Sequence, residues 1–228
     1  MTGLLRALAA LVLFAALPAR AQHDEQVWLQ VNTNVPVAPR LRLTLEQIGR
    51  FGDRPGGLFQ TEFGGLLAYR LADGVELGFG YRMVGAHNGN SAANEDRLRQ
   101  QVVVTRGGFA GRLRVDERFS DGGAEIGFRV RPLLRYNQRI GGLRPLLFVS
   151  HESFFLPNST SWGQRRGYER MRNIAGVTLP LGRQASADLG YLNQYRFARG
   201  GSRAQMDHAL SLQVSINLGA AAAPKVDD

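Results

Sequence analysis

Residues 75–84, VELGFGYRMV, alternate between two kinds of side chain. One set of alternate positions is apolar or aromatic: Val75, Leu77, Phe79, Tyr81 and Met83. The set between them is small or charged: Glu76, Gly78, Gly80 and Arg82. Side chains of a β-strand point alternately to opposite faces, so this period of two predicts a strand whose faces meet different surroundings.

The same alternation recurs along the chain, and few positions suit a helix. It predicts ten strands near residues 39–51, 58–71, 75–84, 95–106, 109–119, 125–137, 143–155, 165–181, 186–197 and 206–218. Short glycine-rich turns alternate with mostly longer loops between these strands. Strands of this length with alternating connections are typical of barrels in the bacterial outer membrane.

We therefore predict an all-β fold, a transmembrane antiparallel up-and-down β-barrel of about ten strands, with twelve as the alternative. The barrel should occupy residues 39–218, followed by a C-terminal tail, 219–228. Residues 22–38, which include Trp28, form either an N-terminal extension or an extra strand. Single-chain bacterial barrels have even strand numbers, so we expect this segment to lie outside the wall.

The first 21 residues have the pattern of a secretory signal peptide. Arg6 precedes an apolar stretch, and Ala19-Arg20-Ala21 provides a small-x-small cleavage site. The chain contains no cysteine, which suits export through an oxidising periplasm. We expect the outer membrane of a Gram-negative bacterium as the location. The expected partners are outer-membrane lipids, lipopolysaccharide and the barrel assembly machinery, with no nucleic acid.

The 228 residues carry a formal net charge of +9, and Lys225 is the single lysine. The basic charge is therefore almost entirely arginine, and it follows the polar phase of the strands. The inward arginines are predicted to be Arg40, Arg42, Arg70, Arg82, Arg97, Arg99, Arg112, Arg114, Arg118, Arg129, Arg131, Arg135, Arg170, Arg172 and Arg196. The predicted inward acids are fewer: Glu46, Glu62, Glu76, Glu95, Asp116, Glu125, Glu152 and Asp188.

Like charges facing each other across strands repel, so the arginine surplus needs an explanation. The lumen is either closed by arginine–carboxylate salt bridges or is a narrow passive pore that favours small anions. The candidate lumen residues are Arg97, Arg99, Arg112, Arg114, Arg118, Arg129, Arg131, Arg135, Glu152, Arg170 and Arg172. A soluble periplasmic barrel that binds a ligand is an alternative, because soluble barrels also alternate. The arginine and glycine of the polar phase favour a lumen.

Several short motifs, in this order, resemble the domain-of-unknown-function 2490 family. They are Trp28, Glu95-x-Arg97-x-Arg99-Gln100-Gln101, Arg112-x-Arg114-x-Asp116-Glu117-Arg118-Phe119, Arg129-x-Arg131, Arg135-Tyr136, Ser150-His151-Glu152-x-Phe154-Phe155, Arg172-x-x-x-Gly176 and Leu189-Gly190-Tyr191. The resemblance spans nearly the whole mature chain. It implies an outer-membrane barrel and assigns no activity.

His151 and Ser153 are two residues apart on one predicted strand and so share a face. A histidine beside a serine hydroxyl is the arrangement that activates a nucleophile, and it resembles the His-x-Ser of outer-membrane phospholipase A, in which an asparagine orients the histidine. Asn158 and Asn173 are the nearby asparagines. An outer-membrane lipid hydrolase is therefore an alternative, but we expect no enzymatic activity, no cofactor and no metal site.

Overall fold

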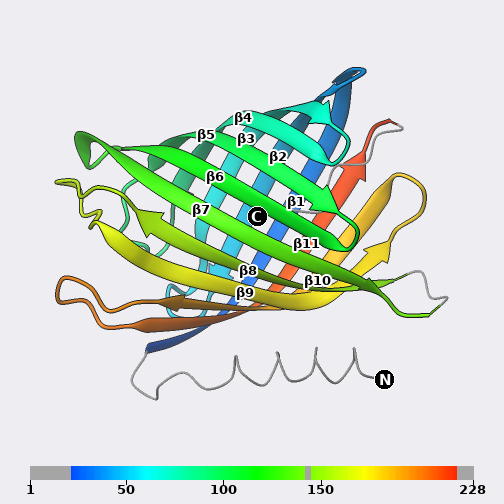
Figure 1. The fold of residues 1–228 in the computed structure, drawn as a ribbon. Coiled ribbons are helices and arrows are strands. Elements are labelled where there is room, and N and C mark those ends of the chain that lie inside the picture. The colour runs from blue at the N-terminus through cyan, green and yellow to red at the C-terminus, as the bar shows by residue number, and fades with distance from the viewer. Residues whose placement is uncertain (1–21, 142–144, 220–228) are drawn as a thin grey trace.

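The computed structural model describes residues 22–141 and 145–219, which form a closed β-barrel (Figure 1). Within this part no helix is long and apolar enough to cross a membrane. The strands are β1 (Gln22–Ala38), β2 (Leu41–Gly52), β3 (Gly57–Ala72), β4 (Val75–Ala86), β5 (Glu95–Arg106), β6 (Phe109–Ser120), β7 (Gly123–Arg139), β8 (Leu146–Leu156), β9 (Gly167–Pro180), β10 (Ala185–Arg196) and β11 (Gln205–Asn217).

The wall has eleven strands, so the prediction of ten or twelve was wrong. Consecutive strands pair antiparallel, and β1 closes the barrel by pairing in parallel with β11, from Gln22 opposite Gln205 to Asn34 opposite Asn217. β1 belongs to the wall because it has the same two faces as its neighbours: Val27 and Leu29 point outward, whereas Gln26 and Gln30 are buried inside. One parallel pair lets an odd number of strands close without a free edge.

The ten predicted strands are confirmed as β2 to β11, with ends that differ by a few residues. The predicted signal peptide, residues 1–21, and all but the first residue of the predicted tail, 219–228, lie outside the described residues. The three longest loops, 87–94, 157–166 and 197–204, lie at one end of the barrel, and the short turns 39–40, 73–74 and 107–108 lie at the other (Figure 1). Because β1 and β11 run in parallel, β1 starts at the long-loop end and β11 finishes at the short-turn end.

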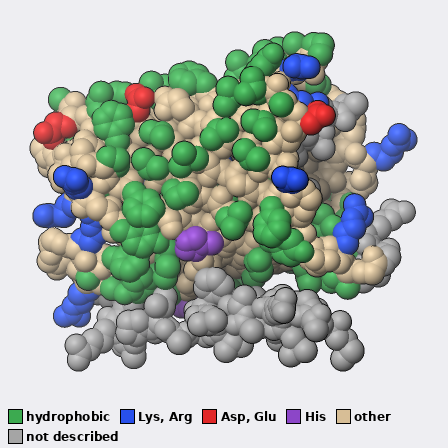
Figure 2. All heavy atoms as spheres, viewed as in Figure 1, with side chains coloured by type: hydrophobic (Ala, Val, Ile, Leu, Met, Phe, Trp, Pro, Cys, Tyr) green, Lys and Arg blue, Asp and Glu red, His purple; other side chains and the backbone are tan. Residues whose placement is uncertain are grey.

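The two faces of the wall differ sharply in chemistry. Large apolar side chains are exposed outside on all the described strands except β9, including Phe79, Met83 and Leu134, which are each more than half exposed. Figure 2 shows them covering the middle of one outer face, while charged side chains gather toward the two ends. The largest fully buried side chains include Arg82, Arg99 and other polar or charged residues that point into the barrel. The barrel therefore buries charge and exposes apolar surface.

The closure by β1 can be tested with paired cysteines, because the chain has no cysteine of its own. Leu29 and Leu212 are direct neighbours across the β1–β11 seam, a spacing that suits a disulfide, which needs Cα atoms about 4.4–6.8 Å apart. We expect L29C/L212C to oxidise fully in the folded protein, as measured by the loss of maleimide-reactive thiols. Leu189 is the neighbour of Leu212 on β10, two strands from Leu29, so L29C/L189C should keep both thiols. Equal labelling of the two variants would show that β1 lies outside the wall.

Candidate functional site: an arginine-lined lumen

The candidate lumen residues meet inside the barrel. Those that are buried there are Arg97, Arg99, Arg112, Arg114, Arg118, Arg129, Arg131, Arg135, Glu152 and Arg172, and Arg170 is half-buried. Each lies on a strand whose alternate residues point to the apolar outer face, so the period of two brings all these guanidinium groups together. Arg50, which the sequence analysis did not select, also faces inward and pairs with Glu62 at 2.8 Å.

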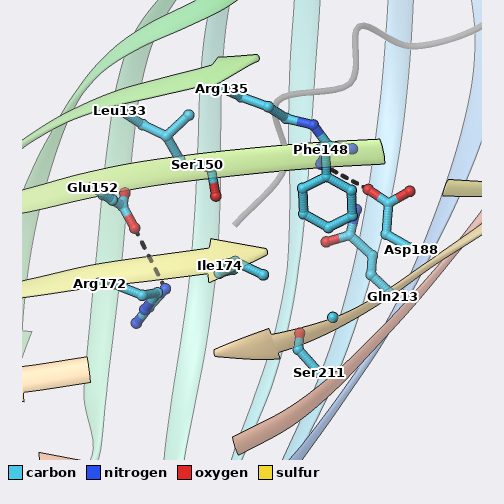
Figure 3. Close-up of a pocket in the computed structure, with 11 residues that line it drawn as sticks. Leu133, Arg135, Phe148, Ser150, Glu152, Arg172, Ile174, Asp188, Ser211 and Gln213 are labelled. Carbon is cyan, nitrogen blue, oxygen red and sulfur yellow. Dashed lines mark hydrogen bonds and ion pairs between the residues drawn. The ribbon is translucent and has the colours of Figure 1, made fainter. Parts of the chain in front are cut away.

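Glu152 on β8 is the centre of one ion-pair cluster. Its carboxylate lies 2.6 Å from Arg112, 2.9 Å from Arg131 and 3.4 Å from Arg172. Figure 3 shows the ion pair with Arg172, which joins β8 to the neighbouring strand β9 on the lumen side of the wall. Three guanidinium groups on one buried carboxylate exceed its single charge, so this cluster keeps a positive charge.

Asp116 on β6 is the centre of an adjoining cluster. It is fully buried and accepts hydrogen bonds from Nε and Nη2 of Arg129, at 2.9 and 2.6 Å. Nη1 of Arg131 lies 3.5 Å away, so Arg131 connects Asp116 with the Glu152 cluster. The arginines of the two clusters are held by shared carboxylates rather than by one acid each.

On the opposite side of the lumen, Glu46 and Glu62 form ion pairs with arginines of β4 and β5. Arg82 lies 2.9 Å from Glu46 and 2.8 Å from Glu62. Arg99 also pairs with Glu46, and Arg97 lies 3.8 Å from Glu62. Polar contacts thus extend around the barrel interior, and they continue from Arg172 through Gln194 to Asp207.

Two aromatic rings, Phe154 and Trp28, contact several of the guanidinium groups in the lumen. The buried ring of Phe154 has Arg129, Arg131, Arg170 and Arg172 within 5.7 Å of its centroid. Trp28 lies between Arg50 and Arg172, at 4.1 and 4.6 Å. The face of an aromatic ring attracts a cation through its quadrupole, so these two rings stabilise guanidinium groups that outnumber the inward carboxylates.

Three inward carboxylates were missed by the sequence analysis, and two predicted inward residues point elsewhere. Asp24 was missed because β1 was placed outside the wall, whereas Asp207 lies within the predicted strand 206–218 and was left out of the inward acids. Glu169 is the extra residue of a β-bulge, where Phe154 pairs with Arg170 and Phe155 with Tyr168. A bulge shifts the alternation by one residue. Arg40 lies in an exposed turn and Glu125 is exposed, so their assignment to the lumen was wrong.

A cavity of about 470 Å³ opens among these residues at the long-loop end. Loop residues such as Arg54 and Asn90 form its rim, and Phe154 lies deeper. Three acids line it, Asp24, Glu62 and Glu95, against ten arginines: Arg50, Arg54, Arg82, Arg97, Arg118, Arg129, Arg131, Arg170, Arg172 and Arg196. A second cavity of about 540 Å³ shares Glu95, Arg118 and Arg196 with it. The long-loop end of the lumen is therefore a wide and strongly cationic vestibule.

The other side of the Glu152–Arg172 pair is nearly filled. The pocket in Figure 3 has a volume of about 20 Å³, room for about one water molecule. Arg135 crosses it to Asp188 at 2.7 Å, with its guanidinium 3.8 Å from the centroid of the Phe148 ring. Glu152 and Arg172 line this pocket as well, and Arg172 also lines the vestibule. Their ion pair therefore separates the wide end from the filled part of the lumen.

His151 and Ser153 lie on the outer face of β8, on either side of the inward Glu152. The Nε2 atom of His151 lies 3.0 Å from the Ser153 hydroxyl, and its Nδ1 atom lies 2.7 Å from Oδ1 of Asn173. Asn173 is the direct neighbour of His151 on β9. The Tyr168 hydroxyl lies 3.1 Å from that of Ser153. The structure thus joins the two sequence candidates to Asn173.

The other candidate, Asn158, lies elsewhere. Its side chain bonds the backbone of Ile126 and Phe128 and the amide of Gln164, and so ties the β8–β9 loop to β7. Register decides between the two asparagines: a residue directly opposite on the neighbouring strand has its Cβ about 5 Å away, and the sequence alone does not give register. Within residues 22–141 and 145–219, no group of three or more histidines or acids is placed to hold a metal ion.

The fold and the lumen define a class: a closed β-barrel with a charged interior. Residues 25–206 match the family model described as "Protein of unknown function (DUF2490)", so the chain belongs to this family, as its motifs predict. It is also similar to an uncharacterised protein of Methylorubrum extorquens, with 28% identity over 234 residues that cover 93% of this chain and 96% of that protein.

Asp116 provides a direct test of the ion-pair network. Asp116→Asn keeps the shape of the side chain but leaves Arg129 and Arg131 buried without their shared carboxylate. Removing one partner of a buried pair costs about 3–5 kcal/mol, and we expect a loss of that size in the free energy of unfolding, measured by urea titration of the folded protein. Glu25 is exposed on the outer face of β1, so Glu25→Gln should change the free energy of unfolding little. Equal stability of the two variants would contradict the network.

Proposed function

We propose that this protein is an outer-membrane β-barrel whose lumen is closed by arginine–carboxylate pairs and whose long-loop end holds a cationic vestibule for anions. The observation that carries the proposal is the distribution of side chains, with charge buried inside and large apolar residues exposed outside. In a soluble barrel the outer apolar side chains would face water, at a cost of about 25 cal/mol for each Å². In a bilayer the same surface meets lipid, and a closed barrel leaves no unpaired strand edge.

A closed lumen fits the structure better than a continuous pore. Below the vestibule, the lumen side chains of Arg112, Arg114, Asp116 and Glu152 are almost completely inaccessible to solvent. In a water-filled channel, the residues of the lining would be hydrated, as in barrels of 16–18 strands. Small barrels are filled by their own side chains, and the shared carboxylates let guanidinium groups fill this one.

The vestibule has the composition of an anion site. Its arginines are positioned by ion pairs and ring contacts before any ligand arrives, and guanidinium groups bind phosphate or carboxylate through paired hydrogen bonds. Arg196 is partly exposed and lines both cavities, and Arg54 is exposed on the rim. These two side chains can turn toward a bound anion without breaking the central clusters. Phosphate groups of lipopolysaccharide and free polyphosphates share the chemistry that would be recognised.

Cell fractionation tests the location. The protein should be recovered in the outer-membrane fraction of its native host, and the unboiled sample should migrate differently from the boiled one on a denaturing gel, because a closed barrel resists unfolding by detergent. Recovery from the soluble periplasm, with no difference between boiled and unboiled samples, would contradict the proposal and favour the soluble binding protein.

Titration calorimetry with inorganic pyrophosphate tests the vestibule. We expect the wild-type protein in detergent to bind pyrophosphate, and Arg54→Ala/Arg196→Ala to weaken the affinity about tenfold or more, because charge-assisted hydrogen bonds are lost. Arg139 and Arg183 are exposed at the short-turn end, so the matched variant Arg139→Ala/Arg183→Ala should bind as the wild type does. Equal weakening by both variants would indicate attraction by net charge alone, and a steady conductance of the wild type in planar bilayers would contradict the closed lumen.

A further inference from the structure

The hydrogen bonds around His151 fix its proton. Oδ1 of Asn173 can only accept, so the Nδ1 atom of His151, 2.7 Å away, carries the hydrogen and donates it. In the neutral ring Nε2 then has a free lone pair, and it accepts the hydroxyl proton of Ser153 over 3.0 Å. This is the tautomer that a histidine needs to act as a general base toward a serine.

Tyr168 completes the arrangement. Because the Ser153 hydroxyl donates to His151, its oxygen accepts the hydrogen of the Tyr168 hydroxyl, 3.1 Å away. Tyr168 reaches this position through the β-bulge at Glu169, which places it opposite Phe155 on the outer face. Bulges are frequent beside active sites, where they redirect a side chain. To stabilise the negative oxygen that forms during attack on a carbonyl, this hydroxyl would turn its hydrogen from the Ser153 oxygen to that neighbouring oxygen.

The surroundings indicate the substrate. His151 is exposed, and its neighbours on the outer wall include Leu134 and Val149, which are apolar and exposed. Toward the long loops the rings of Phe155, Tyr168 and Phe197 follow one another at 4.8 Å. A polar residue on a membrane-facing wall is costly and by default marks function. An uncharged asparagine orients the histidine here at a smaller desolvation cost than a carboxylate would.

Against the expectation from the sequence that the protein has no enzymatic activity, we infer that Ser153, His151 and Asn173 form a catalytic triad that hydrolyses an acyl ester of a membrane lipid. This inference rests on the proposed membrane location, because the triad faces the surface that the lipid would cover. The shared chemistry of the substrate is a fatty-acyl ester whose chain lies along the apolar wall. The carbonyl would meet Ser153 near the aromatic row, at the long-loop side of the wall.

The reaction balances with water as the second substrate. The Ser153 oxygen forms a bond to the ester carbonyl carbon while its proton passes to Nε2 of His151. The bond from that carbon to the lipid alcohol breaks, and the alcohol leaves with the proton from Nε2. Water then attacks the acyl-serine, gives a proton to Nε2, and the fatty acid is released as Ser153 recovers its hydrogen. Asn173 is a positioning residue, since it acts only through His151.

The test measures fatty-acid release by the full-length protein in mixed detergent micelles, with phosphatidylethanolamine in one arm and lipopolysaccharide in the other. We expect release in at least one arm, and the arm identifies the lipid. Ser153→Ala and His151→Ala should lower the rate about a thousandfold or more. The matched control is His208→Ala: His208 is bonded to the Tyr191 hydroxyl at 2.6 Å on the outer wall, and its loss should leave the rate unchanged.

Two further readouts separate catalysis from folding. A fluorophosphonate probe should label the wild type at Ser153, and the gel shift should show that each variant remains a folded barrel. Asn173→Leu should lower the rate of fatty-acid release. Asn173→Asp still accepts the hydrogen bond from Nδ1, so its rate should be close to that of the wild type. The added negative charge should move the acidic limb of the pH–rate profile to higher pH. Absence of both release and labelling in a folded sample, or release that persists in Ser153→Ala, would overturn the triad while leaving the proposed location and vestibule intact.

Discussion

The constraint on which the rest of this structure depends is the neutralisation of guanidinium groups enclosed by a closed wall. Arginines cannot lose their charge inside a protein, and an uncompensated buried charge is among the most costly features a fold can contain. Glu46, Asp116 and Glu152 meet this constraint by each serving several arginines. Phe154 and Trp28 add the faces of their rings, so one counter-charge per arginine is not required.

Strand alternation makes the two faces of the wall interdependent. On β8, Glu152 points inward to three arginines, and its sequence neighbours His151 and Ser153 point outward. A shift of this strand by one residue would reverse both assignments. The ion pairs of Glu152 therefore do more than stabilise the interior: they fix the register that places His151 opposite Asn173. The interior charge network and the outer serine–histidine pair are consequently positioned by the same strand.

The sequence predicted most of the wall because the alternation within 75–84 and similar stretches directly reflects the two faces of a strand. It also identified the inward arginines from Arg97 to Arg135, whose phase is unbroken. What it could not provide was pairing between strands. The partner of His151 depends on register, Glu169 turns inward because of a bulge that has no residue signature, and β1 joins the wall through a contact with the far end of the chain.

That contact has a consequence for the order of assembly. Ten of the eleven pairings join strands that are adjacent in the described chain and can form as local hairpins, whereas the β1–β11 seam joins residues such as Trp28 and Ser211, which are separated by most of the chain. The chain loses loop-closure entropy before the contacts of such a distant pairing can form, so the formation of this seam is slow. Until the seam closes, β1 and β11 both carry open edges, and the growing sheet has an inside that is not yet sealed. Formation of the β1–β11 seam therefore converts an open, curved sheet into a barrel. Until it forms, the two open edges can pair wrongly with another copy of the chain.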